Sequence, residues 1–246
     1  GATGFGQGHI HAEGYTASPD CEIVAAADIK QDNLDLFCGQ HDVPSGYLSH
    51  KEMLEKEDLD IVSVCLWPHL HAPIVIDVAQ ALGAKGRPVR AIYAEKPMAP
   101  TWGESKQMAA VCEQNGVILA FNHQRRFGKP FRKAKELLDS GAIGELTRLE
   151  AFTSNLYDWG THWFDMMFFY NDEEPVEWVI GQIDARGGRP IFGVTVEGQG
   201  LSFWKWRNGV YGLMATGQKV VRPEAGQGAR EPLCGNRLIG TEGVIE

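Results

Sequence analysis

The sequence has little positive charge and no long apolar run. Its 246 residues contain 23 lysines and arginines against 32 aspartates and glutamates, which gives a formal net charge of −9. An acidic chain without a basic run does not fit a phosphate backbone, so we expect no nucleic-acid partner. No apolar stretch approaches the roughly 20 residues that a membrane-spanning helix needs, so we also expect no membrane partner.

Cysteines are few, odd in number and scattered. None of the five forms a Cys-x-x-Cys pair. A disulfide framework and a structural zinc site are therefore not favoured, and a reducing, cytoplasmic location is predicted. The two His-x-His pairs, His9/His11 and His69/His71, have no third ligand at a supporting spacing. We therefore predict that the protein binds no metal.

The first half of the chain alternates short apolar runs with segments typical of helices. The runs, which we predict to be strands, are residues 22–28, 59–66, 89–93 and 117–121. Helices are predicted at residues 11–17, 31–40, 71–82 and 102–114. Continuous apolar strands separated by helices of about ten residues indicate an α/β fold with a parallel sheet covered on both faces.

The pattern changes after residue 122. A helix at 131–140, a strand at 145–153 and a helix at 162–170 are followed by strand-like sequence from 176 to 217. Successive strands with little helix between them favour a mixed or antiparallel sheet. We therefore predict two domains, residues 1–122 and 123–246.

A glycine-rich segment opens the chain. Gly4, Gly6 and Gly8 precede a predicted helix, where glycines let the backbone approach a pyrophosphate, but their spacing is not a regular G-x-G-x-x-G. By itself the segment fits either a dinucleotide site or a flexible turn. Asp28 ends the next strand, 24 residues after Gly4, where an acid can bind ribose hydroxyls. Such an acid repels a 2′-phosphate and favours NAD over NADP, although Lys30 acts in the opposite direction.

A lysine follows the third predicted strand directly. Lys96 stands between Glu95 and Pro97, at the carboxyl end of a parallel strand, where ligands bind in α/β folds. Burial or a nearby positive charge could lower the pKa of such a lysine from about 10.4 towards 7–8 and suit it to proton transfer. The residues alone fit a surface Lys-Glu pair in a turn equally well.

A second polar cluster lies at the start of the 162–170 helix. Asp158 and His162 are four residues apart and can share a face, and Asp165 could hold the imidazole tautomer. Trp159 could lie against the C–H face of a sugar ring. The alternative is a capping aspartate with a histidine packed in the core.

These segments together resemble the Gfo/Idh/MocA family of nicotinamide-dependent sugar and polyol oxidoreductases. The resemblance rests on AEKPMA at 94–99, NHQRRF at 122–127, SGAIGEL at 140–146 and DWGTHWFD at 158–165, and extends to PHLHAP and the closing GTEGVIE. It implies a Rossmann domain followed by a substrate domain with an open-faced mixed sheet, which commonly forms a homodimer or homotetramer interface. It also implies Lys96 as the catalytic lysine, with Asp158 and His162 completing the active site.

The resemblance also guides the remaining site residues. We expect NAD, with NADP possible, to lie against His11, His71, Glu95 and Pro97 besides the glycine segment and Asp28, and the sugar or polyol to lie against Asn122, Arg126 and Trp159. The family's chains are longer. We therefore expect the first strand of the parallel sheet to precede Gly1 and more of the second sheet to follow Glu246.

Two other functions remain open at this point. One is a glycosidase that oxidises a sugar transiently with bound NAD, eliminates the leaving group and reduces the product back. The other is an NAD-binding regulator without catalysis on the same fold.

Overall fold

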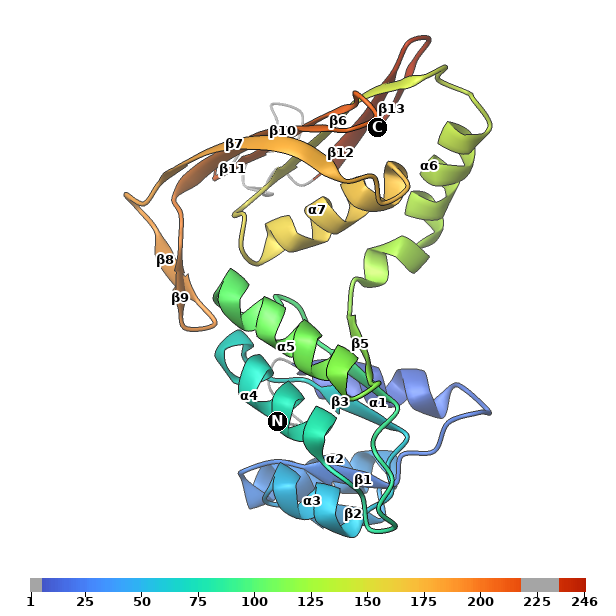
Figure 1. The fold of residues 1–246 in the computed structure, drawn as a ribbon, viewed down its shortest axis with the longest axis vertical. Coiled ribbons are helices and arrows are strands. Elements are labelled where there is room, and N and C mark those ends of the chain that lie inside the picture. Colours follow the sequence, from blue (N-terminus) through green and yellow to red (C-terminus); the bar gives the residue numbers. More distant parts are fainter. Residues whose placement is uncertain (1–5, 218–234) are drawn as a thin grey trace, which may run out of the picture. The chain divides into compact units, whose positions relative to one another are not determined.

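The computed structural model describes residues 6–217 and 235–246 and divides into two compact units (Figure 1). The first unit is Gly1–Asn122 and the second is His123–Glu246. The division lies where the hydrophobic pattern of the sequence changes. It stays a prediction that the first unit binds the dinucleotide and that the second unit binds the substrate.

The first unit has the α/β pattern expected from its sequence. Its elements are α1 (Gln7–Thr16), β1 (Ala25–Ala27), α2 (Gln31–His41), β2 (Ser45–Tyr47), α3 (His50–Lys56), β3 (Ile61–Val64), α4 (Pro68–Gln80), β4 (Ala91–Ala94), α5 (Trp102–Gln114) and β5 (Ile118–Phe121). The pairings between the described strands of this unit are parallel: β1 with β2, and β3–β4–β5 in that order. The Rossmann-type fold class is thus confirmed, with the described strands in two parallel sheets.

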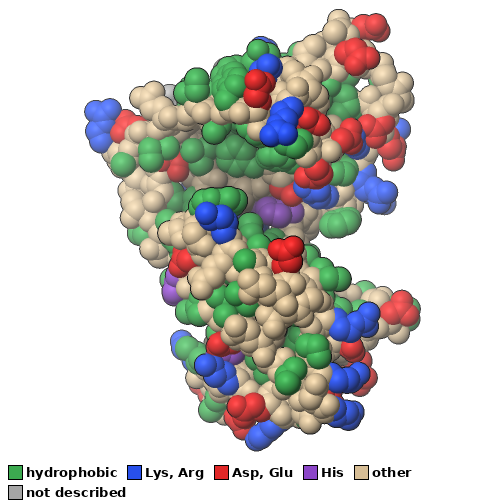
Figure 2. Space-filling view, in the orientation of Figure 1, with side chains coloured by type: hydrophobic (Ala, Val, Ile, Leu, Met, Phe, Trp, Pro, Cys, Tyr) green, Lys and Arg blue, Asp and Glu red, His purple; other side chains and the backbone are tan. Residues whose placement is uncertain are grey.

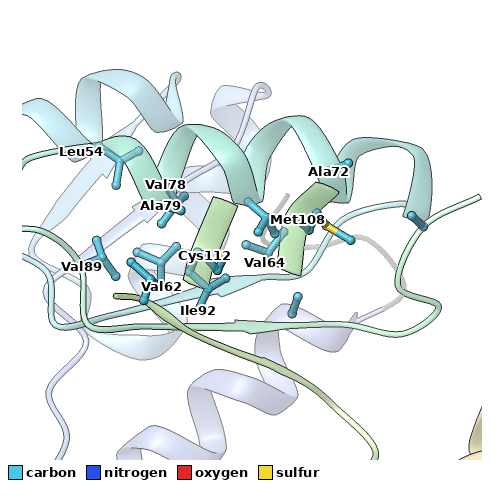
Figure 3. Packing of buried hydrophobic residues seen from close by; sticks show 14 residues of the cluster. Leu54, Val62, Val64, Ala72, Val78, Ala79, Val89, Ile92, Met108 and Cys112 are labelled. Carbon is cyan, nitrogen blue, oxygen red and sulfur yellow. The ribbon is translucent and has the colours of Figure 1, made fainter. Parts of the chain in front are cut away.

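The core of the first unit explains why the strands carry continuous apolar runs. Val62 and Val64 of β3 and Ile92 of β4 are buried against α4 and α5, which supply Val78 and Met108 (Figure 3). Each of these side chains is no more than 7% exposed. Burial of this kind stabilises the sheet edge at which β3, β4 and β5 end, and the predicted site residues follow those strands.

The second unit is built around one mixed sheet. Its elements are the 3₁₀ helix η2 (Gln124–Phe127), α6 (Lys129–Asp139), β6 (Leu146–Thr153), α7 (Trp159–Tyr170), β7 (Val176–Asp184), β8 (Arg189–Ile191), β9 (Val194–Val196), β10 (Gln199–Trp206), β11 (Tyr211–Thr216), β12 (Gly235–Gly240) and β13 (Val244–Ile245). The sheet order is β13-β12-β6-β11-β10-β7. Because β6 and β11 are parallel and the other pairs are antiparallel, the predicted mixed sheet is confirmed.

The two faces of the mixed sheet differ. One face packs on α7, where Trp163 and Met166 contact Trp206 and Met214 in a buried cluster. The opposite face carries a row of aromatic rings, and the edge strand β7 leaves Ile180 66% exposed. The sheet is therefore covered on one face and open on the other, as the family resemblance implied.

Charged side chains of both signs are interspersed over the face that Figure 2 shows. On that face the described lysines and arginines do not gather into a single basic patch. In the part of the chain that the structure describes, every helix is too short or too polar to cross a membrane.

Candidate functional site

The glycine segment leads into the first turn of α1. Gly6 is the N-cap, with a φ of 73° in the left-handed region, and a Cβ added there would meet no atom within 4 Å. The residue is therefore glycine for its backbone conformation rather than for space. No side chain caps this helix, and its first turn carries no acid. Gly8 is buried within α1, whereas Gly4 lies outside the described residues.

The N-terminus of α1 is suited to an anion. The first N–H groups of a helix lack intrahelical partners, and the helix dipole places partial positive charge there. A pyrophosphate fits such an end without competing with a capping side chain. The helix begins four residues earlier than predicted, because residues 7–10 (QGHI) form its first turn instead of remaining a loop.

Asp28 follows β1 directly, as the sequence predicted for a ribose-binding acid. The residue is 6% exposed, and its Oδ1 accepts hydrogen bonds from the Lys30 backbone N–H at 2.9 Å and from Asn33 Nδ2 at 3.5 Å. These contacts fix the carboxylate at the end of the strand. Together with the α1 N-terminus, Asp28 provides the two groups that a dinucleotide requires, so the residues present fit this cofactor.

Glu95 is the centre of a buried polar cluster at the ends of β4 and β5. Its Oε1 accepts a hydrogen bond from Asn122 Nδ2 at 2.7 Å and lies 3.1 Å from His11 Nε2. Its Oε2 accepts the backbone N–H of Lys96 at 3.2 Å. Tyr93 donates its hydroxyl proton to Asn122 Oδ1 at 2.6 Å, which orients the amide. The structure thus brings three predicted site residues, His11, Glu95 and Asn122, into direct contact.

The protonation of this cluster follows from its donors. Burial raises the pKa of Glu95, but hydrogen bonds from His11 and Asn122 outweigh burial, so the pKa lies below its ordinary value. An ionised Glu95 only accepts, so His11 Nε2 carries a proton and donates it. His11 Nδ1 lies 3.1 Å from Ser63 Oγ, which lies 2.7 Å from the Tyr15 hydroxyl. These contacts form a continuous chain when Tyr15 donates to Ser63, Ser63 donates to His11 Nδ1 and His11 Nε2 donates to Glu95.

The segment after Lys96 is held by a histidine of α4. The Lys96–Pro97 peptide bond is cis. His71 is fully buried, and its Nδ1 lies 3.0 Å from both Pro97 O and Met98 O. Its Nε2 lies 3.0 Å from Leu66 O. Both ring nitrogens of His71 are therefore adjacent to backbone carbonyls, and its role as a direct cofactor contact stays a prediction.

In the second unit, the DWGTH segment forms the start of α7. Asp158 is the N-cap residue, but its side chain makes no capping hydrogen bond. Asn155 does so instead, because its Oδ1 accepts the backbone N–H groups of Asp158 at 2.6 Å and Trp159 at 3.4 Å. His162 is 5% exposed and meets the ring of His123 edge-on at 5.9 Å. Asp158, Trp159 and His162 therefore share the first turn of one helix.

Arg126 connects η2 to α7. Its Nε and Nη2 each bind one carboxylate oxygen of Asp165 at 2.7 Å, and its Nη1 binds Glu173 at 2.6 Å. Asp165 is therefore engaged by an arginine, in a bidentate pair that fixes both groups. The proposed contact of Arg126 with substrate stays untested, and its guanidinium is already committed to two carboxylates.

Arg125 points into an aromatic group beside His162. Its guanidinium lies 4.5 Å from the centroid of Trp163, 5.6 Å from Trp159 and 5.9 Å from Phe131. Cation–π contacts of this kind stabilise a planar cation between rings. The arginine thereby holds Trp159, which is 42% exposed, at the surface beside His162.

Several residues of the Glu95 cluster and of the α7 start were not predicted from the sequence. Ser63 and Tyr93 lie inside apolar strand runs, where a polar residue is itself a signal of a buried contact. Asn155 stands three residues before Asp158, at the spacing of a residue that caps a helix start. In the ranges that the structure describes, no three His, Cys, Asp or Glu side chains form a group that could hold a metal ion.

Comparison with known families now identifies the chain. Residues 1–123, half of the sequence, match the model of the Gfo/Idh/MocA oxidoreductase family, described by its NAD-binding Rossmann fold. The chain belongs to this oxidoreductase family. The resemblance inferred from the motifs is confirmed.

Curated proteins similar to this chain include a myo-inositol 2-dehydrogenase from Thermotoga maritima. It is 30% identical over 146 residues, which are 59% of this chain and 42% of that protein. The scyllo-inositol 2-dehydrogenase (NAD+) of Bacillus subtilis is 26% identical over 147 residues, or 41% of its length. The matched segment therefore spans less than half the length of these relatives.

A solved dehydrogenase structure shares the fold of this chain over almost its whole length. The WlbA dehydrogenase from Bordetella pertussis, in complex with NADH and UDP-GlcNAcA, superposes with a TM-score of 0.78 and 21% identity. The alignment covers 99% of this chain and 70% of that one. At this identity the likeness concerns the fold alone.

Proposed function

We propose that the protein is an NAD-dependent oxidoreductase that transfers a hydride between a sugar, polyol or sugar derivative and the nicotinamide. The observation that carries the proposal is the Glu95 cluster, which holds the backbone of Lys96 at the end of β4. The α1 N-terminus and Asp28 are assigned to the cofactor's pyrophosphate and ribose. When bound, the nicotinamide supplies the hydride acceptor.

Lys96 and His162 are assigned to the acid–base step. Oxidation of a carbinol requires that the hydroxyl lose its proton as the carbon loses hydride, and a side-chain base accelerates this step by about 10²–10⁴-fold. Lys96 Nζ is assigned to take that proton together with His162. Asp158 is assigned to orient the pair and balance its charge. The curated relatives that act on inositols support a polyol as the substrate class.

The lysine assignment is tested with Lys96→Met in the full-length protein. We expect NAD binding, measured by calorimetry, to change less than about threefold, and turnover with NAD and a panel of cyclitols and aldoses to fall at least about 10³-fold. Lys106→Met, on the exposed face of α5, is the matched control and should leave turnover unchanged. Turnover close to wild type in Lys96→Met would refute the assignment.

The same assay, with glycosides added to the panel, separates the alternative functions. Glycoside cleavage that depends on bound NAD without net NADH would indicate the transient-oxidation glycosidase. NAD binding with neither reaction across the panel would indicate the regulator.

Asp28 supports NAD as the preferred dinucleotide. Its buried carboxylate is anchored by the Lys30 N–H and would repel a 2′-phosphate. Asp28→Ala should weaken NAD binding and narrow the difference between NAD and NADP affinities, measured by calorimetry with each nucleotide. An unchanged ratio of the two affinities would contradict this role.

The open face of the mixed sheet supports a homo-oligomer. Phe203 and Tyr211 stack at 5.6 Å with an interplanar angle of 6°, and Trp178 meets Phe203 at 5.6 Å, so the face carries an aromatic row that a second copy could cover. Sedimentation should show a dimer or tetramer that Phe203→Asp dissociates. Trp102→Asp, at an exposed aromatic of the first unit, should leave the assembly intact.

A further inference from the structure

We infer that His71, held in the Nδ1–H tautomer, is a positioning residue for Lys96. The inference rests on the proposed role of Lys96 in the acid–base step. No part of it requires His71 to touch cofactor or substrate, because its task is to hold the backbone that follows the lysine.

The tautomer follows from the three carbonyl oxygens around the ring. Nδ1 lies 3.0 Å from two of them, Pro97 O and Met98 O, whereas Nε2 lies 3.0 Å from one, Leu66 O. A neutral imidazole has one N–H, and its other nitrogen presents a lone pair. With the proton on Nδ1, one ring lone pair faces one carbonyl oxygen and is repelled by it. With the proton on Nε2, the ring lone pair faces two carbonyl oxygens. The Nδ1–H form is therefore favoured, and it donates a bifurcated hydrogen bond to the segment after Lys96.

The imidazole of His71 is neutral at pH 7 because its pKa is lowered. Burial lowers the pKa of His71, and the three carbonyls together with the charge of Glu95 offset only part of that effect. The thiols at the end of β3 and in α5, two elements that pack on α4, stay neutral at neutral pH. Burial raises the pKa of the Cys65 thiol to about 12 and raises that of the Cys112 thiol in α5.

His71 is mounted on a rigid part of the fold. It closes the first turn of α4, next to Ala72, which is 5% exposed and packs beside Met108 of α5 (Figure 3). Closely packed side chains of this kind do not shift without cost. The carbonyls of Pro97 and Met98 are therefore tied to the helix layer of the first unit.

Lys96 is consequently held from both sides. Its own N–H donates to Glu95 Oε2 at 3.2 Å, and the carbonyl of the next residue, Pro97, accepts from His71. Loss of the second contact leaves the backbone after Lys96 without its anchor. A displacement of about 1 Å at a reacting group can lower a rate by about 10²-fold, so the expected effect falls on kcat rather than on cofactor binding.

The test uses two substitutions, one that keeps a donor at the position of Nδ1 and one that keeps a donor at the position of Nε2. His71→Asn places an amide N–H where Nδ1 stands, whereas His71→Gln places one where Nε2 stands. With NAD and the cyclitol and aldose panel, we expect His71→Asn to keep kcat within about tenfold of wild type and His71→Gln to lose about 100-fold. The KM for NAD should stay within about threefold in both. His69→Gln, two residues away on the exposed side of the helix, should behave as wild type.

A measurement on the wild-type protein keeps the inference testable if the variants fold poorly. ¹⁵N-detected imidazole spectra at pH 7 should show His71 protonated at Nδ1 and unprotonated at Nε2. An Nε2–H tautomer, or equal losses of kcat in His71→Asn and His71→Gln with both variants folded, would overturn it. Failure of the proposed function is recognised separately, because Lys96→Met would then retain turnover while the His71 tautomer remained as described.

Discussion

Replacing Glu95 with glutamine should destabilise the first unit while leaving its shape unchanged. The substitution removes the charge that accepts hydrogen bonds from His11 and Asn122, at 3.1 and 2.7 Å. If the amide oxygen keeps these two donors, the amide N–H₂ faces the backbone N–H of Lys96, which then loses its acceptor. Hydrogen bonds to a charged group contribute about 1.5–3 kcal/mol, and an unsatisfied buried donor costs about 1–3 kcal/mol. We therefore expect a net loss of about 2–3 kcal/mol, since the amide oxygen still accepts one or two bonds.

Thermal unfolding followed by circular dichroism measures this loss. For a chain of this size, 2–3 kcal/mol corresponds to a decrease in Tm of about 4–12 °C. Glu113→Gln, at an exposed position in α5, is the matched control and should change stability by less than about 0.5 kcal/mol. Glu95→Gln and Glu113→Gln should also differ in how strongly their stability depends on pH below neutrality. Because the pKa of Glu95 is lower in the folded than in the unfolded protein, its carboxylate stabilises the fold at pH values above the unfolded pKa. This stabilisation disappears as the pH falls through the folded pKa.

Two outcomes would contradict this role of Glu95. If Glu95→Gln matched Glu113→Gln in Tm at pH 7, the Glu95 carboxylate would not be the acceptor on which the cluster depends. If wild type and Glu95→Gln instead lost stability in parallel between pH 6 and pH 3, Glu95 would not have a depressed pKa in the folded protein.

Three further outcomes follow from the contacts. Asn155→Ala should cost about 1 kcal/mol in urea unfolding, because it removes the cap of α7, whereas Asn155→Asp should retain most of the stability. Arg126→Ala should cost about 3 kcal/mol or more in the same assay, because it leaves the half-buried Asp165 carboxylate without its bidentate partner, and a loss below about 0.5 kcal/mol would contradict that. The depressed pKa of His71 makes the unfolded chain bind more protons below about pH 6.5, so stability should fall as the pH falls from there. His71→Asn should remove that slope, as measured by Tm between pH 7 and pH 5.

The sequence was most informative where burial forces a simple pattern. The runs at 59–66, 89–93 and 117–121 correspond to β3, β4 and β5, since strands buried on both faces admit only apolar residues. The helix predicted at 102–114 has the bounds of α5, where Thr101 and Glu104 form a capping box. By contrast, β2 and α3 were not predicted. Ser45–Tyr47 has no apolar run, and seven residues are too few for a clear helical period.

The candidate site divides in the same way. Lys96, Asp158 and His162 could be selected from their motifs, because the motif and the carboxyl end of a strand are both properties of the sequence. The partners of these residues could not. The spacing of three residues suggested that Asp165 could hold the imidazole tautomer of His162. In the structure both carboxylate oxygens of Asp165 bind Arg126, a contact that this spacing does not reveal.

The order of the amino acids was sufficient to predict the α/β pattern, the change of architecture near residue 122 and the family. These depend on hydrophobic periodicity and on short motifs, which are local along the chain. The contacts of Glu95 with His11, 84 residues away, and of His71 with the carbonyl of Pro97, 26 residues away, became visible only in the folded chain. Such contacts depend on which strand ends and helices meet at one edge of a sheet, and no local pattern encodes the direction of a buried hydrogen bond.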